Sequence, residues 1–156
     1  MQTLTCCFTG HRNLPQNAVE HIVLRLNEEV DNLIRQGVTH FLSGGARGFD
    51  LIAAALIVSK KETGADVRLD FILPCRDQDA LWPEREQKLY RGLLTEADGV
   101  TVLFDAYRPG CMKHRNQYMV DHSDYCIYAL LRECSSTWQT VQYARRKGVR
   151  LISVAG

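Results

Sequence analysis

A glycine-rich segment separates an apolar run from a helical pattern in the first third of the chain. It reads Ser43-Gly44-Gly45-Ala46-Arg47-Gly48-Phe49-Asp50. Glycines ahead of a helix leave backbone N–H groups free, and the helix dipole favours an anion there. The alternative is a tight turn with close helix–sheet packing, since the segment matches neither GxGxxG nor GxxxxGK[ST]. Its glycines exceed what a simple turn needs, so it predicts an anion site. Asp50 either caps the helix or accepts a hydrogen bond from a ligand hydroxyl.

A second polar segment, Thr9-Gly10-His11-Arg12, follows the first apolar run. Gly10 permits a sharp turn or a close approach to a ligand. Arg12 could hold a phosphate with its fork of donors, and His11 could donate to a phosphate or act as acid or base near neutral pH. The alternative is a polar loop with solvated ends.

Polar residues also follow the fourth and fifth apolar runs. Arg115 and Asn116 fall on a short helical pattern that ends at Asp121. Ser136 and Thr137 open the last helical pattern, where hydroxyls and free N–H groups could hold a phosphate. These residues therefore join the candidate ligand site.

Two other patterns in this region carry little weight. The first is the spacing C-x2-H-x7-H-x3-C, formed by Cys111, His114, His122 and Cys126. Finger-like zinc sites usually show two tight ligand pairs separated by a longer loop, so we expect no metal. The second is a Ser-His-Asp set formed by Asp121, His122, Ser123 and Asp124. Triad members usually come from separated segments, so the chain shows no complete catalytic constellation.

Short apolar runs alternate with helical patterns along the whole chain. The runs cover 4–9, 39–43, 69–74, 99–104, 125–131 and 149–155, and the helical patterns cover 19–34, 49–59, 82–97, 113–120 and 137–147. Runs that are apolar on both faces indicate a parallel sheet covered by helices. Right-handed crossovers then predict an α/β fold, a three-layer Rossmann-like and doubly wound sheet of six mainly parallel strands in the order 3-2-1-4-5-6. Ligands bind such sheets at the carboxyl ends of the strands, near the switch between strands 1 and 4.

Length and charge narrow the class of protein. The 156 residues predict one domain, 1–156, and the 19 basic and 18 acidic residues give a net charge of +1. Proteins that bind nucleic acid usually carry a clear basic excess, so the balance argues against such a partner. The six cysteines form no CxxC, and no apolar stretch suits a signal peptide or a membrane helix. We expect free thiols, a cytoplasmic location and no membrane partner.

Five stretches of the chain resemble the SLOG superfamily, the Rossmann-like group that links the Smf/DprA and LOG proteins. They are TCCFTGHR, SGGARGFDLIAA, LPC, PGCMKHRNQYMVDHSD and STWQTVQYARRKG, in matching order and at matching distances. The small bacterial YpsA-like proteins look like the closest branch. The resemblance implies a nucleotide-binding sheet whose ligand loops contain Gly10, His11, Arg12, Ser43, Gly44, Gly45, Gly48, Arg115, Asn116 and Asp121.

The chain departs from its relatives after the fifth run. Relatives usually have Gly-Gly-Thr where this chain has Ser135-Ser136-Thr137, and it lacks the PGGxGT motif and following glutamate of the LOG enzymes. We therefore expect a sensor or regulatory protein that binds a small nucleotide-derived ligand and no other cofactor. The sequence leaves open whether it is a monomer or a homodimer. The alternatives are a nucleotide N-glycosidic hydrolase, with Asp50 or Asp121 as catalytic residue, and a single-stranded DNA binder, which the charge balance disfavours.

Overall fold

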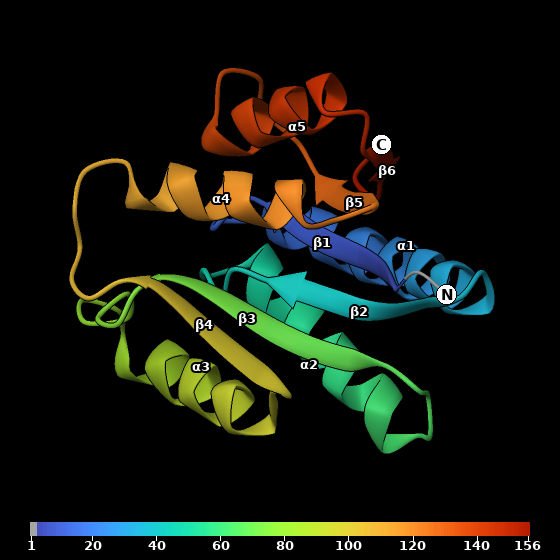
Figure 1. The fold of residues 1–156 in the computed structure, drawn as a ribbon, viewed down its shortest axis with the longest axis horizontal. Helices are drawn as coiled ribbons and strands as arrows, with labels where there is room; N and C mark the ends of the chain where they lie inside the picture. Colours follow the sequence, from blue (N-terminus) through green and yellow to red (C-terminus); the bar gives the residue numbers. More distant parts are fainter. Residues whose placement is uncertain (1–2) are drawn as a thin grey trace.

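The computed structural model describes residues 3–156 and consists of alternating strands and helices (Figure 1). The strands are β1 (Leu4–Gly10), β2 (Val38–Ser43), β3 (Arg68–Cys75), β4 (Gly99–Phe104), β5 (Tyr125–Ala129) and β6 (Arg150–Ser153). The helices are α1 (Gln16–Arg35), α2 (Phe49–Glu62), α3 (Glu84–Glu96), α4 (Cys111–Asp121) and α5 (Ser136–Arg146). Each lies where the apolar periodicity predicts it. No helix within residues 3–156 is long and apolar enough to cross a membrane.

The strands form one parallel sheet in the order β4-β3-β2-β1-β5-β6. The prediction of a doubly wound Rossmann-like sheet is confirmed. The predicted strand order is wrong at β4, which pairs with β3 at one edge and not with β1. The low burial of β4 agrees with an edge position, because Val100 is 47% exposed and Thr101 is also exposed. The switch point therefore lies between β1 and β5.

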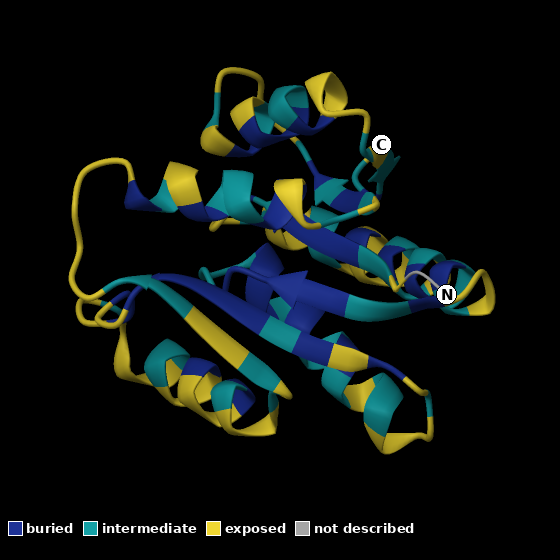
Figure 2. Ribbon diagram, viewed as in Figure 1, coloured by how far each residue is buried: buried dark blue, intermediate teal, exposed yellow. Residues whose placement is uncertain are grey.

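Two helical layers cover the sheet, and the strands contribute alternate side chains to each. On one face α1, α2 and α3 enclose the larger core, to which β1 contributes Cys6 and Phe8. On the other face α4 and α5 enclose a smaller core that contains Cys7, Met119 and Ala144. Figure 2 shows the buried residues running through the middle of the sheet and the exposed ones on the outer helix surfaces and along β4.

The strand order reverses at the switch point between β1 and β5, and this reversal leaves space for a site at the carboxyl ends of the strands. The chain leaves β4 at the far edge and returns through α4, which contacts β3, β1 and α5 (Figure 1). The first turns of α4 and α5 then meet the carboxyl ends of β1 and β5. Residues from five separate loops and helix starts are thereby gathered at one edge of the sheet.

Candidate functional site

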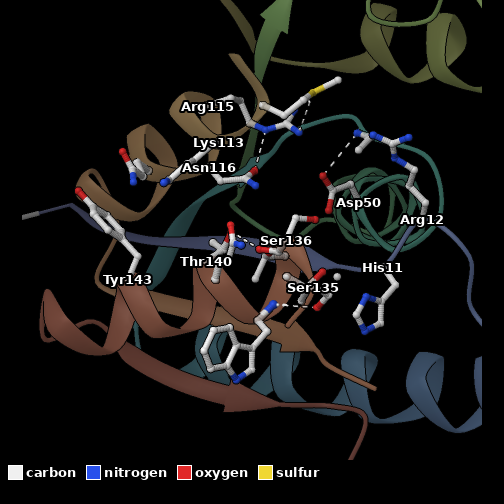
Figure 3. A pocket seen from close by; sticks show the side chains of 18 of the residues that line it. His11, Arg12, Asp50, Lys113, Arg115, Asn116, Ser135, Ser136, Thr140 and Tyr143 are labelled. Carbon is white, nitrogen blue, oxygen red and sulfur yellow. Dashed lines mark hydrogen bonds between the residues drawn. The ribbon is translucent and has the colours of Figure 1, made fainter. Parts of the chain in front are cut away.

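A cavity of about 790 Å³ lies at the carboxyl end of β1, between the starts of α4 and α5 (Figure 3). Of the predicted site residues, those that line it are Thr9, Gly10, His11, Arg12, Asp50, Arg115, Asn116, Ser136 and Thr137. The others, Ser43, Gly44, Gly45, Gly48 and Asp121, do not line it. The cavity is also lined by basic and aromatic residues that sequence reasoning left out, namely Tyr107, Lys113, Arg132, Trp138, Tyr143 and Arg146.

The glycine-rich segment is filled by the protein's own side chains rather than open to a ligand. A Cβ atom on Gly44 would lie 2.6 Å from the Arg115 guanidinium, and one on Gly45 would lie 2.9 Å from Tyr90. A Cβ atom on Gly48 would lie 2.2 Å from the Arg12 carbonyl oxygen. These contacts explain the excess of glycines as close packing, so the predicted anion cradle at 43–48 is corrected to a packed turn. Only its Ala46 reaches the cavity.

Arg115, on α4, forms hydrogen bonds with the glycine-rich turn. Its guanidinium is buried and donates to the Gly44 carbonyl at 2.5 Å, to Gln78 Oε1 at 3.4 Å and to Asn116 Oδ1 at 2.8 Å. Burial lowers the pKa of Arg115, and the neighbouring Asp50 opposes that shift. Arg115 therefore joins the loop to α4 from a buried position in the cavity wall.

Asp50 lies in the first turn of α2 and is buried in the cavity wall. Its Oδ2 accepts a hydrogen bond from the N–H of Ala46, in the loop before the helix, at 3.4 Å. The predicted capping role is wrong, because Gly48 is the N-cap of α2 and no side chain caps this helix. Burial raises the pKa of Asp50 from 3.8 to about 6, and Arg115 partly offsets this effect. Asp50 is therefore a carboxylate that titrates close to neutral pH.

His11 connects two of the loops that form the cavity. Its Nε2 accepts a hydrogen bond from the Leu131 N–H at 2.9 Å, and its carbonyl oxygen accepts one from the Phe49 N–H at 3.2 Å. Because a backbone N–H can only donate, the ring proton is on Nδ1. Burial and the charge of Arg132 lower the pKa of His11. The side chain is a neutral structural link, with only Nδ1–H left for a ligand.

Asp121 is turned away from the other predicted site residues. It lies at the last residue of α4, where it accepts a hydrogen bond from the Tyr143 hydroxyl at 2.7 Å and pairs with Lys147 at 3.8 Å. Asp121 itself does not line the cavity, although its partner Tyr143 does. Asp121 therefore forms a contact between α4 and α5 beside the cavity, and its catalytic role stays a prediction.

The start of α5 faces the cavity with its free N–H groups. Ser135 is the N-cap, since its Oγ accepts a hydrogen bond from the Trp138 N–H at 3.1 Å. Thr137 is buried in the same wall. Ser135, Ser136 and Thr137 at the start of α5 all line the cavity.

Charge gathers at this site although the chain as a whole is close to neutral. The lining contains the basic residues Arg12, Lys113, Arg115, Arg132 and Arg146 and, within residues 3–156, a single acidic residue, Asp50. Arg12, Lys113, Arg132 and Arg146 are exposed and form no ion pair with any residue that the structure describes. Position along the chain gives no sign of this cluster, because its basic members come from two loops and two helices.

The fold and the cavity define a Rossmann-like domain with a basic cavity at the switch point of its sheet. The YpsA family model, described as the YspA SLOG family, matches residues 6–148, and the chain belongs to this family. The predicted membership of the SLOG superfamily is thereby confirmed.

Relatives and solved structures agree with this assignment. A UPF0398 protein of Halalkalibacterium halodurans is 30% identical over 108 residues, which cover 68% of this chain and 57% of that protein. The SPbeta prophage-derived protein YoqJ of Bacillus subtilis is 25% identical over 141 residues, covering 80% and 82%. The chain spans less than three fifths of the length of the Halalkalibacterium protein.

Two structures of DNA processing protein A share the fold. The one from Helicobacter pylori, described for its single-stranded DNA binding mode, has a TM-score of 0.70 at 20% identity and covers 96% of this chain and 64% of that one. The one from Streptococcus pneumoniae has a TM-score of 0.71 at 13% identity and covers 97% and 50%.

Proposed function

We propose that this chain binds a nucleotide or a nucleotide-derived ligand in the cavity at the switch point, in a sensor or regulatory role. The observation that carries this proposal is the set of unpaired basic residues that line the cavity: Arg12, Lys113 and Arg132 near the starts of α4 and α5, and Arg146 at the last residue of α5. Helix starts present free N–H groups and a partial positive charge, and arginine forks match phosphate oxygens. A phosphate at this place would neutralise charge that the protein itself leaves unpaired.

The experiment is thermal-shift screening followed by calorimetry. We expect AMP, GMP and ADP to stabilise the protein and the corresponding nucleosides to do so far less, because the phosphate carries the contacts. Arg132→Ala and Arg146→Ala should each weaken nucleotide binding by about tenfold, the usual effect of losing a hydrogen bond to a charged group. The matched control is Arg85→Ala, at an exposed arginine on α3 outside the cavity. Equal effects at Arg85 and Arg146 would contradict the proposal.

Hydrolysis of a nucleotide is the second candidate, and Asp50 favours it. A buried carboxylate whose pKa is raised to about 6 has the properties of a general acid or base. The test is chromatographic detection of free base after AMP is incubated with the protein. Base release that is lost in a folded Asp50→Asn variant would move the chain to this class, whereas binding without release supports the sensor role.

Single-stranded DNA is the third candidate, suggested by the fold shared with the Helicobacter protein. The exposed basic residues of the cavity, Arg12, Lys113, Arg132 and Arg146, would attract the phosphates of such a strand, although the net charge of the chain is close to zero. Stacking platforms for successive bases and a continuous basic groove are what such binding needs. Fluorescence anisotropy with a labelled deoxythymidine oligonucleotide tests it. An oligonucleotide that binds far more tightly than any mononucleotide would replace the first proposal by this one.

A further inference from the structure

The cavity has two levels that differ in burial and in charge. Its floor contains Thr9, Asp50, Arg115 and Thr137, which are only 5%, 5%, 3% and 2% exposed. Its rim contains the exposed residues Arg12, Lys113, Arg132 and Arg146. The charges of Asp50 and Arg115 cancel when both are ionised, so the floor is neutral in sum while the rim is positive. A ligand that fits both levels has a neutral polar part and an anionic part.

The floor keeps hydrogen-bonding capacity that the protein does not use. The hydroxyls of Thr9 and Thr137 form no hydrogen bond with any residue from 3 to 156, and within the same residues the Asp50 carboxylate accepts only the 3.4 Å bond from Ala46. No fully enclosed side-chain nitrogen or oxygen in the described part of the chain lacks a partner. The free oxygen atoms of these three residues therefore reach open space, which is the cavity that they line. A ligand that fills the cavity would remove these atoms from solvent and would therefore have to supply their hydrogen bonds.

We propose that the floor binds the ribose hydroxyls of the ligand, with the Asp50 carboxylate accepting from the vicinal diol and Thr137 and Thr9 beside it. The phosphate then lies toward the start of α5 and the basic rim. This inference rests on the proposed nucleotide-binding function and narrows the ligand to one that contains a ribose phosphate. Figure 3 shows Asp50 and Ser136 on elements that enclose the same space, α2 and α5.

The chemistry of the floor favours hydroxyls over charged groups. An ionised carboxylate only accepts hydrogen bonds, so its partner must be a donor. The buried guanidinium of Arg115 acts on Asp50 electrostatically and disfavours an ammonium group at that place. Asp50 in turn disfavours a phosphate there. Hydroxyls are neutral donors that can also accept from the two threonines, so a sugar diol meets all three requirements.

The test compares ribose and deoxyribose at constant phosphate and base. Calorimetry with AMP, 2′-deoxy-AMP and 3′-deoxy-AMP measures the contribution of each hydroxyl, and the matching guanine compounds show that the effect does not depend on the base. We expect loss of a hydroxyl to weaken binding by about tenfold or more, because its acceptor is charged and buried. In Asp50→Asn the affinity for AMP should fall to that for the deoxy compounds, whose own affinity should change little.

Two controls separate recognition from folding. Asp66→Asn, at an exposed aspartate in the α2–β3 loop outside the cavity, should retain the wild-type preference. Thr137→Val removes a floor hydroxyl at constant size and should reduce the preference, which tests the floor even if Asp50→Asn fails to fold. Equal affinities of the wild-type protein for AMP and both deoxy compounds would overturn the ribose inference and leave the proposed function standing. Absence of binding by all nucleotides would overturn both.

Discussion

At the scale of residues, Asp50 combines the features that a site requires and a stable fold disfavours. It is a buried carboxylate beside a buried guanidinium, and the protein supplies it with one long hydrogen bond. Such a group costs stability when ionised, because burial penalises charge. Natural proteins retain costs of this kind mainly at functional sites.

Stability should reveal this cost through its dependence on pH. Because the pKa of Asp50 is about 6 in the folded protein against 3.8 as its ordinary value, the folded state holds its proton more tightly. The contribution of Asp50 to stability therefore falls as pH rises from about 4 to about 6. We expect Asp50→Asn to gain about 3 kcal/mol relative to wild type between pH 3.5 and 7.5, measured by urea unfolding. A difference that does not change with pH would contradict this account.

Gly48 should tolerate no side chain, for reasons of space as well as conformation. It has a φ of +80°, and a Cβ would lie 2.2 Å from the Arg12 carbonyl. Gly64 has a φ of +99°, but a Cβ there would contact nothing within 4 Å. We expect Gly48→Ala to cost clearly more than Gly64→Ala, with the left-handed conformation alone costing roughly 1 kcal/mol. Unfolding curves of the two variants measure the difference, and equal costs would show that the packed turn has room.

At the scale of elements, the helix starts are what turn a sheet edge into a binding surface. The first turn of α5 presents its N–H groups to the cavity, with one of them held by Ser135. The first turn of α4 contributes Lys113 and the buried Arg115. The reversed return from β4 to β5 places both helices on the same face, so the two starts share one cavity.

Two neighbouring serines allow the capping role to be tested apart from the lining of the cavity. Ser135 Oγ accepts from the Trp138 N–H and donates to the Arg132 carbonyl at 2.9 Å, whereas Ser136 Oγ forms no hydrogen bond with residues 3–156. We expect Ser135→Ala to lower the free energy of unfolding by about 1 kcal/mol, the usual cost of losing an N-cap. Ser136→Ala should leave it nearly unchanged. Thermal or urea denaturation checks this, and similar losses in both variants would rule out the assigned cap.

At the scale of the whole molecule, the arrangement of charge matters more than its sum. A net charge of +1 conceals a cavity whose exposed rim carries four basic residues without ion pairs to the described chain. The acidic residues instead form pairs elsewhere, such as Asp98 with Lys61 and Glu86 with Arg47. The electrostatic field of these clustered charges attracts anions, and dissolved salt shortens the distance over which it acts.

Nucleotide affinity should therefore fall as salt is raised. The Debye length shortens from about 10 Å at 0.1 M to about 3 Å at 1 M, so exposed rim charges lose most of their effect. We expect AMP binding, followed by calorimetry at increasing sodium chloride, to weaken steadily in the wild-type protein. The slope should be smaller in an Arg132→Ala/Arg146→Ala double variant and unchanged in Arg85→Ala. A salt-independent affinity would show that the rim does not contact the phosphate.

The sequence by itself determined the elements and most of the loops at the site. Apolar runs with both faces buried predict the parallel strands, and glycine or polar residues at their ends predict the turns of which Thr9, Arg12 and Thr137 are part. These signals are local, because strand and helix periodicity and capping depend on neighbouring residues.

Tertiary structure alone decided which of those residues meet. The edge position of β4 depends on pairing with β3, which no local pattern encodes. From the sequence, the glycines of 43–48 are equally compatible with an anion and with a neighbouring side chain or backbone. In the fold, Arg115, Tyr90 and Arg12 pack against them. Asp121 and Arg115 lie on one short helix, yet the residues of α4 that line the cavity end at Gln117. The basic rim likewise exists only once β1, α4 and α5 are brought together, because charges from distant segments combine through space and not along the chain.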